Sequence, residues 1–84
     1  MTDTIVTVAR DRKGRVARHR AGSDPVWVAA TYEARNGRYV RGPDLGLSRS
    51  GRAPSARFVR EVRDAAAAAG YRYVEGIRHG DPVI

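Results

Sequence analysis

The most constraining feature of this 84-residue chain is the dipeptide Asn36-Gly37, which lies between two segments with strand character. Asn-Gly is a preferred loop of a two-residue β-hairpin, because both central residues of a type I′ turn need positive φ. Residues 26–35, which precede it, alternate with the period of two that a strand requires. We therefore expect an antiparallel hairpin over residues 26–41. The expected cross-strand pairs are Arg35 with Arg38, Ala34 with Tyr39, and Tyr32 with Arg41.

The alternation within this hairpin assigns its side chains to two faces, since neighbours along a strand point in opposite directions. The face that we expect to pack in the core consists of Val26, Val28, Ala30, Tyr32 and Tyr39. The opposite face carries Trp27, Arg35 and Arg38. A tryptophan exposed beside arginines can stack a base or anchor a protein partner, and it can equally belong to a second small core. These three residues are a candidate interaction site.

A first hairpin is expected before this one. Residues 4–10 are rich in β-branched side chains, residues 11–14 have turn chemistry, and a second strand follows at about residues 15–20. The basic residues of this hairpin are Arg10, Arg12, Lys13, Arg15, Arg18 and Arg20. A basic β-ribbon can lie along a nucleic-acid backbone, and charge on a strand rim can also serve only to prevent edge pairing. Both interpretations stay open.

After the second hairpin the sequence predicts a long loop, a helix and a last strand. Residues 42–53 are the loop, and loops of about a dozen residues are often functional. Pro54 and Ser55 predict a helix start, and Gly70 predicts its end. Apolar residues at helical spacing between them are Phe58, Val59, Val62, Ala66 and Ala69. Residues 71–77 are expected to form the final strand, and about the last six residues a fraying tail.

The resulting order, ββββαβ, predicts a single small α+β domain over residues 1–84. One helix on one face of a mostly antiparallel sheet, built from two hairpins and a C-terminal strand, is a two-layer sandwich. The expected core residues are Val6, Val8, Val26, Val28, Tyr32, Phe58, Val62, Ala66 and Val74.

The charge of the chain is strongly positive and unevenly placed. Sixteen basic and nine acidic residues give +7, which favours polyanionic partners. Residues 1–23 carry six basic and two acidic groups, and residues 48–63 carry five basic and one acidic group, so each segment contributes +4. Residues 24–47 are neutral, and residues 64–84 contribute −1. All the basic residues except Lys13 are arginine, and a coding bias in the genome produces the same skew.

The arginines of residues 48–63 surround the expected helix start. Free backbone N–H groups and the helix dipole favour anions there, so stability alone would place acidic side chains at this end. The candidate phosphate-binding residues of this segment are Arg49, Arg52, Arg57, Arg60 and Arg63. The first hairpin adds Arg12, Lys13, Arg15 and Arg18 as a second candidate contact.

Catalytic and metal chemistry find little support. The chain has no cysteine, no phosphate-binding loop and no nucleophile elbow, and its two histidines, His19 and His79, have no metal-ligand spacing. We expect no catalytic residue, no metal and no cofactor, although His19 and His79 leave a metal-independent ribonuclease as a less favoured alternative. The sequence shows no secretory leader or membrane span, which favours a cytoplasmic location without a membrane partner.

Residues 26–70 resemble the second half of a double-stranded-RNA-binding domain. The resemblance rests on residues 48–50, Arg57, Arg60 and the alanine run at 65–69, and it implies that a basic helix start grips phosphates. A hairpin replaces the first helix of that family, and its lysine pair is not reproduced. The same stretch is similar to the three-stranded arm-binding module of phage integrases, through residues 27–30 and the Asn-Gly turn.

These observations predict a small, non-enzymatic nucleic-acid-binding protein. The alternative is an accessory or inhibitor protein of the phage or mobile-element type, which docks on an acidic protein surface or on a nucleic-acid-processing complex. Trp27 and residues 42–53 would then carry the contact. The choice between DNA and RNA stays open, as does the formation of a homodimer.

Overall fold

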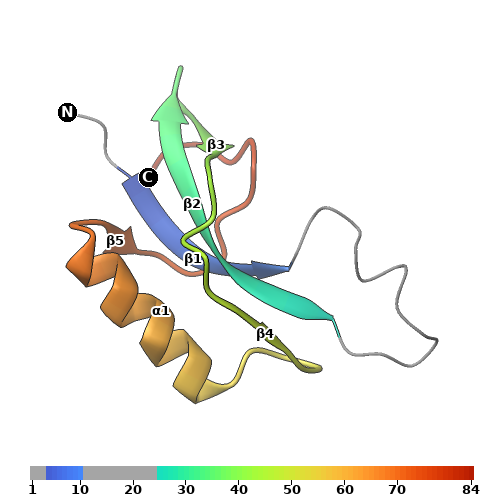
Figure 1. Cartoon of the computed structure of the whole chain (residues 1–84). Coiled ribbons are helices and arrows are strands. Elements are labelled where there is room, and N and C mark those ends of the chain that lie inside the picture. Colours follow the sequence, from blue (N-terminus) through green and yellow to red (C-terminus); the bar gives the residue numbers. More distant parts are fainter. Residues whose placement is uncertain (1–3, 11–24) are drawn as a thin grey trace.

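A computed structural model describes residues 4–10 and 25–84, and it shows a mostly antiparallel sheet with one helix packed on it (Figure 1). The elements are β1 (Thr4–Arg10), β2 (Val26–Arg35), β3 (Arg38–Arg41), β4 (Ser48–Ser50), α1 (Ala56–Ala68) and β5 (Arg72–Tyr73). The predicted α+β class and the order ββββαβ are confirmed. The predicted strand at residues 15–20 lies outside the described residues, so the first hairpin cannot be compared.

The sheet has the strand order β3-β2-β1-β5, and β4 also pairs with β2. β1 runs antiparallel to β2 along its whole length. β5 lies parallel to β1 on its other edge, and only Arg72 and Tyr73 take part in this pairing. The final strand predicted over residues 71–77 is therefore too long. The chain turns at Gly76, whose φ of 78° suits glycine, and continues across the sheet instead of along its edge.

The hairpin over residues 26–41 has the predicted register. Arg35 is opposite Arg38, Ala34 is opposite Tyr39, and Tyr32 is opposite Arg41. Asn36 and Gly37 both have positive φ, 52° and 76°, as the two-residue turn requires.

The loop predicted over residues 42–53 is in large part an interrupted strand. Residues 42–47 lie opposite residues 29–31 of β2, and β4 then pairs with residues 26–28. Three backbone amides of this segment donate to carbonyls along β2 and just before it: Gly42 to Thr31 at 2.8 Å, Leu45 to Ala29 at 2.9 Å, and Gly51 to Pro25 at 3.0 Å. These bonds satisfy the free edge of β2, which is why a segment rich in glycine and serine stays extended.

One face of the sheet packs against α1. Its buried cluster consists of Val6, Ala29, Phe58, Val62 and Ala66, with Val8, Trp27, Leu45, Leu47 and Tyr73 packed around it. The predicted assignment of Trp27 to the face away from the core is wrong. Both faces of β2 carry enough apolar side chains to be buried, so the alternation could not show which one meets the helix.

The other face is covered by the C-terminal segment, residues 74–84. Its buried cluster consists of Ile5, Ala30, Tyr32 and Tyr39, and Val74 and Ile77 pack against it. Three backbone hydrogen bonds hold the end of this segment to the hairpin: Tyr39 to Asp81 at 2.8 Å, Gly80 to Tyr39 at 2.8 Å, and Val83 to Gly37 at 2.9 Å. The predicted fraying tail is therefore wrong, because main-chain pairing orders it. Val28 and Tyr32 are buried as predicted, but not beneath the helix, and Val26 and Val74 are only partly buried.

Candidate nucleic-acid interface

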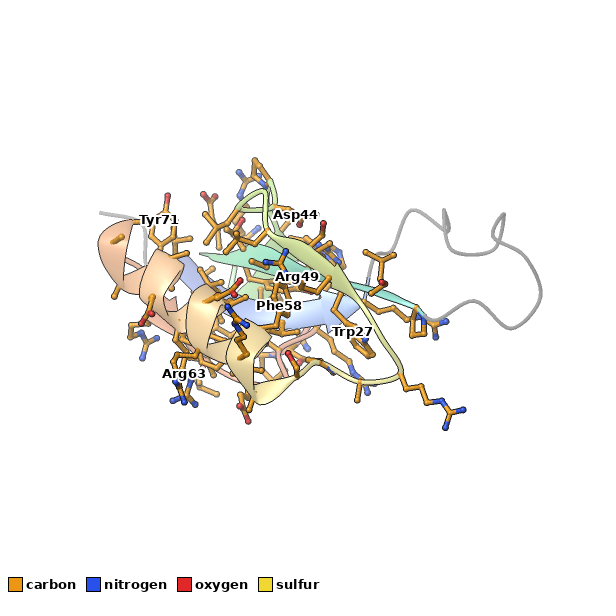
Figure 2. The ribbon with its side chains drawn as sticks, turned by 60° about the horizontal axis from the view of Figure 1, so that its bottom comes forward. Trp27, Asp44, Arg49, Phe58, Arg63 and Tyr71 are labelled. Carbon is orange, nitrogen blue, oxygen red and sulfur yellow. The ribbon has the colours of Figure 1, made fainter. Side chains whose placement is uncertain are left out.

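The five arginines of residues 48–63 lie on β4, on the loop that follows it and on α1. All five are exposed: Arg49, Arg52, Arg57, Arg60 and Arg63. β4 runs beside the N-terminal half of α1, and Figure 2 shows Arg49 next to Phe58 between the two elements. The structure therefore brings Arg49 of the strand against the helix, beside Phe58.

Glu61 is the acidic residue that organises this side. Its carboxylate accepts from Arg49 Nη2 at 3.2 Å and lies 3.8 Å from Arg57 Nε. Arg49 also donates from Nη1 to the Ser48 carbonyl at 2.8 Å, and its guanidinium lies 5.9 Å from the centre of the Phe58 ring. The side chains of Arg49 and Arg57 are 59% and 91% exposed, so salt screens both pairs and each contributes little to stability. Their main effect is to orient two guanidinium groups around one carboxylate.

Arg52 and Arg60 have no such partner. Neither makes an ion pair or a hydrogen bond with any residue in the described ranges, and both side chains are exposed. Asp64, one turn after Arg60 on α1, forms no ion pair within those ranges either. Two permanent positive charges are thus left open to solvent, one on the loop after β4 and one on α1, where Arg60 lines a shallow hollow with Arg63.

Arg63 belongs to the opposite flank of α1. Its Nη2 lies 3.8 Å from Glu75 Oε1, and its guanidinium lies over the Tyr73 ring at 4.9 Å from the centroid. Burial raises the pKa of Tyr73 above its usual value and the charge of Glu75 acts in the same direction, while Arg63 opposes them. Arg63 is therefore engaged with β5, and we place it at the rim of the candidate interface.

The start of α1 is capped by Ser55. The side-chain oxygen of Ser55 accepts from the Phe58 N–H at 3.1 Å, so the serine recognised in the sequence is the N-cap. The first turn holds no acidic residue. The positive end of the helix is thus not compensated by a carboxylate in that turn, in agreement with the charge pattern of the sequence.

The candidate interaction site of Trp27, Arg35 and Arg38 is not assembled. Trp27 and Arg35 stand at opposite ends of β2, about 26 Å apart at roughly 3.3 Å per residue. Trp27 packs on the helix side and donates from Nε1 to the Gly51 carbonyl at 2.9 Å. Arg35 pairs with Glu33 at 3.7 Å, and Arg38 donates to a backbone carbonyl of the C-terminal segment. Trp27 thus holds the loop that carries Arg52, and it also lines a pocket together with Arg10 and Arg41.

Most of the second predicted contact cannot be placed. Arg12, Lys13, Arg15 and Arg18 lie outside the described residues, as does His19, and Arg10 is exposed at the end of β1. His79 is held against β3, where its Nδ1 accepts from the Arg41 N–H at 3.3 Å. Arg41 was predicted only as the cross-strand partner of Tyr32, although its spacing of three residues from Asp44 also allows the ion pair that the two form at 3.0 Å.

Residues 4–10 and 25–84 contain no group of three or more histidine, cysteine, aspartate or glutamate side chains that could hold a metal ion. The helix within these ranges is too short to cross a membrane. Comparison of the chain with protein-family models, with curated proteins and with solved structures finds no match.

Proposed function

We propose that this protein binds nucleic acid without catalysis, and that it grips the phosphate backbone through Arg49, Arg52, Arg57 and Arg60. The observation that carries the proposal is the exposure of Arg52 and Arg60 without an acidic partner among the described residues, in a segment that also holds two arginines sharing Glu61. A guanidinium is planar, permanently charged and able to donate two parallel hydrogen bonds to a phosphate.

The pair around Glu61 supports this role in a different way. Each of its guanidinium groups is more than half exposed and retains N–H groups directed to solvent, while Glu61 limits their freedom. Less side-chain entropy is lost when an already oriented group meets its ligand. Arg49 and Arg57 are thus positioned before contact, and Arg52 and Arg60 supply the uncompensated charge.

The proposal is tested by measuring affinity for duplex DNA, duplex RNA and single strands over a range of salt concentrations. Four phosphate contacts release counterions and give log K a slope of about −3 to −4 against log salt. Arg52→Gln and Arg60→Gln each remove one contact, so each is expected to flatten the slope by about 1. The preferred probe also decides between DNA and RNA.

Arg35→Gln is the matched control, because Arg35 is likewise an exposed arginine but lies at the far end of β2, paired with Glu33. This variant should keep the wild-type slope. Failure to bind any of the probes, or equal slopes in all three variants, would overturn the proposal.

A further inference from the structure

A half-open pocket of about 490 Å³ lies between the end of β1, the hairpin and the C-terminal segment. Its apolar walls come from Val8, Ala9 and Ile77, and Tyr32 and Arg41 also line it. This volume is within the range of about 300–1,000 Å³ that small-molecule sites occupy, and such sites combine apolar walls with a few polar groups. Trp27, which donates to the Gly51 carbonyl, lines the pocket as well, whereas none of the four arginines of the proposed phosphate contact is among its described lining residues.

Arg41 is the unusual residue of this pocket. Its side chain is only 6% exposed, and Nη2 pairs with Asp44 Oδ1 at 3.0 Å. No other residue in the described ranges accepts from its remaining guanidinium N–H groups. A buried guanidinium normally has its donors satisfied, because desolvating them without a partner is costly. Arg41 therefore offers unused charged donors at the wall of the pocket.

Tyr32, the cross-strand partner of Arg41, presents a second unused group. It is 3% exposed, and its hydroxyl makes no hydrogen bond with the described residues. The hydroxyl of Tyr39 is also without a partner but is sealed from solvent, whereas that of Tyr32 is not sealed. A largely buried tyrosine usually finds a partner for its hydroxyl, so that of Tyr32 is available to a ligand.

The described lining of the pocket is rich in cations. Arg10 and Arg78 also line it, together with His79, and no acidic residue of the described ranges does, although Asp44 pairs with Arg41 from outside the lining. Because His79 Nδ1 accepts from the Arg41 N–H, the neutral imidazole carries its proton on Nε2, where it can donate. The described part of the lining thus combines apolar side chains with charged and neutral hydrogen-bond donors.

We propose that this pocket binds one nucleotide unit, with the base between the apolar walls and the phosphate on Arg41, the Tyr32 hydroxyl and the neighbouring cations. The choice of a nucleotide over other organic anions with a flat apolar body rests on the proposed function. The same unit can come from a free mononucleotide or from an unpaired nucleotide at the end of a bound strand.

The test is a titration of the full chain with adenosine 5′-monophosphate. Binding is measured by calorimetry and by the amide NMR shifts of residues 76–79. We expect saturable binding that moves these amides, and at least about tenfold weaker binding of adenosine and of inorganic phosphate, since each lacks one half of the contacts. A 5′-phosphorylated single-stranded hexanucleotide should move the same amides if strand ends are the source. If only the mononucleotide moves them, free nucleotides are the source.

Tyr32→Phe and Tyr39→Phe form a matched pair, because each removes a hydroxyl that lacks a hydrogen bond and only Tyr32 lines the pocket. Tyr32→Phe should weaken the binding of adenosine 5′-monophosphate about tenfold, the usual effect of losing a hydrogen bond to a charged group. Tyr39→Phe should leave it unchanged. If the two variants bind adenosine 5′-monophosphate with equal affinity, the proposal is overturned. It is also overturned if millimolar nucleotide does not shift the amides of residues 76–79.

The failure of this proposal can be distinguished from that of the proposed function. Arg52→Gln and Arg60→Gln should bind adenosine 5′-monophosphate as the wild type does. Suppose that oligonucleotides bind with the expected salt dependence, but that neither the mononucleotide nor the hexanucleotide shifts the amides of residues 76–79. That result would overturn the pocket proposal and leave the proposed function standing. Mononucleotide binding without salt-dependent binding of oligonucleotides would overturn the proposed function and support the pocket as a site for free nucleotides.

Discussion

The two faces of the sheet are buried by different means. Beneath α1, one periodic helix supplies Phe58, Val62 and Ala66 to a continuous cluster. The other face is covered by the irregular segment 74–84, which contributes few apolar side chains and is held by backbone hydrogen bonds. Among the described residues, the sealed hydroxyls without a partner are those of Thr7 and Tyr39, and both belong to this second face. The helix thus leaves no sealed hydroxyl without a partner among the described residues of its side, whereas the irregular cover leaves two.

The largest effect should come from emptying the helix-side cluster. Phe58→Ala removes a ring that is 1% exposed, so we expect the free energy of unfolding to fall by about 4 kcal/mol. A domain of this size has a total stability of about 4–13 kcal/mol, so a large part of the variant can be unfolded. Urea titration followed by circular dichroism measures the change. Val83→Ala, at a side chain that is 38% exposed, should change it by less than about 0.5 kcal/mol.

A smaller effect is expected from the cover of the second face. Ile77 is only partly buried against Tyr32 and its neighbours, so Ile77→Ala should lower the free energy of unfolding by about 1–2 kcal/mol. The same urea titration measures it. A loss as large as that of Phe58→Ala would show that the irregular segment stabilises the sheet as strongly as the helix does, and the contrast between the two faces would be wrong.

The smallest effect should have the opposite sign. The Tyr39 hydroxyl is sealed without a hydrogen-bond partner, so Tyr39→Phe removes an uncompensated desolvation cost. We expect the free energy of unfolding to stay equal or to rise by up to about 1 kcal/mol, measured by the same titration. A fall of more than about 1 kcal/mol would mean that this hydroxyl has a partner, and the second face would then be as well satisfied as the first.

The elements whose chemistry is local could be predicted from the sequence. Asn36 and Gly37 require one kind of turn, and that turn sets the register of the hairpin around it. Ser55 and the apolar spacing after it define the helix, because capping and periodicity act within a few residues. The face that meets the helix was predicted wrongly, since both faces of β2 are buried and no polar side distinguishes them.

The segments held by backbone pairing could not be predicted. Residues 42–50 and 80–83 are rich in glycine, proline and polar side chains, and their order comes from N–H and C=O groups that every residue carries. The same limit applies to the sites. The exposed arginines of residues 48–63 could be identified from charge alone, whereas the pocket at Tyr32 and Arg41 depends on where the C-terminal segment crosses the sheet.

The hydrogen bond from Trp27 Nε1 to Gly51 has a practical consequence. The chain contains one tryptophan, so its emission under excitation near the red edge of indole absorption comes from this residue without interference from the tyrosines. The indole touches the turn between Arg49 and Arg52 and also lines the pocket at Tyr32 and Arg41, which makes it an intrinsic optical probe of both places. A polyanion bound there would change the emission of Trp27. Its binding could therefore be measured at nanomolar protein concentration without any attached dye.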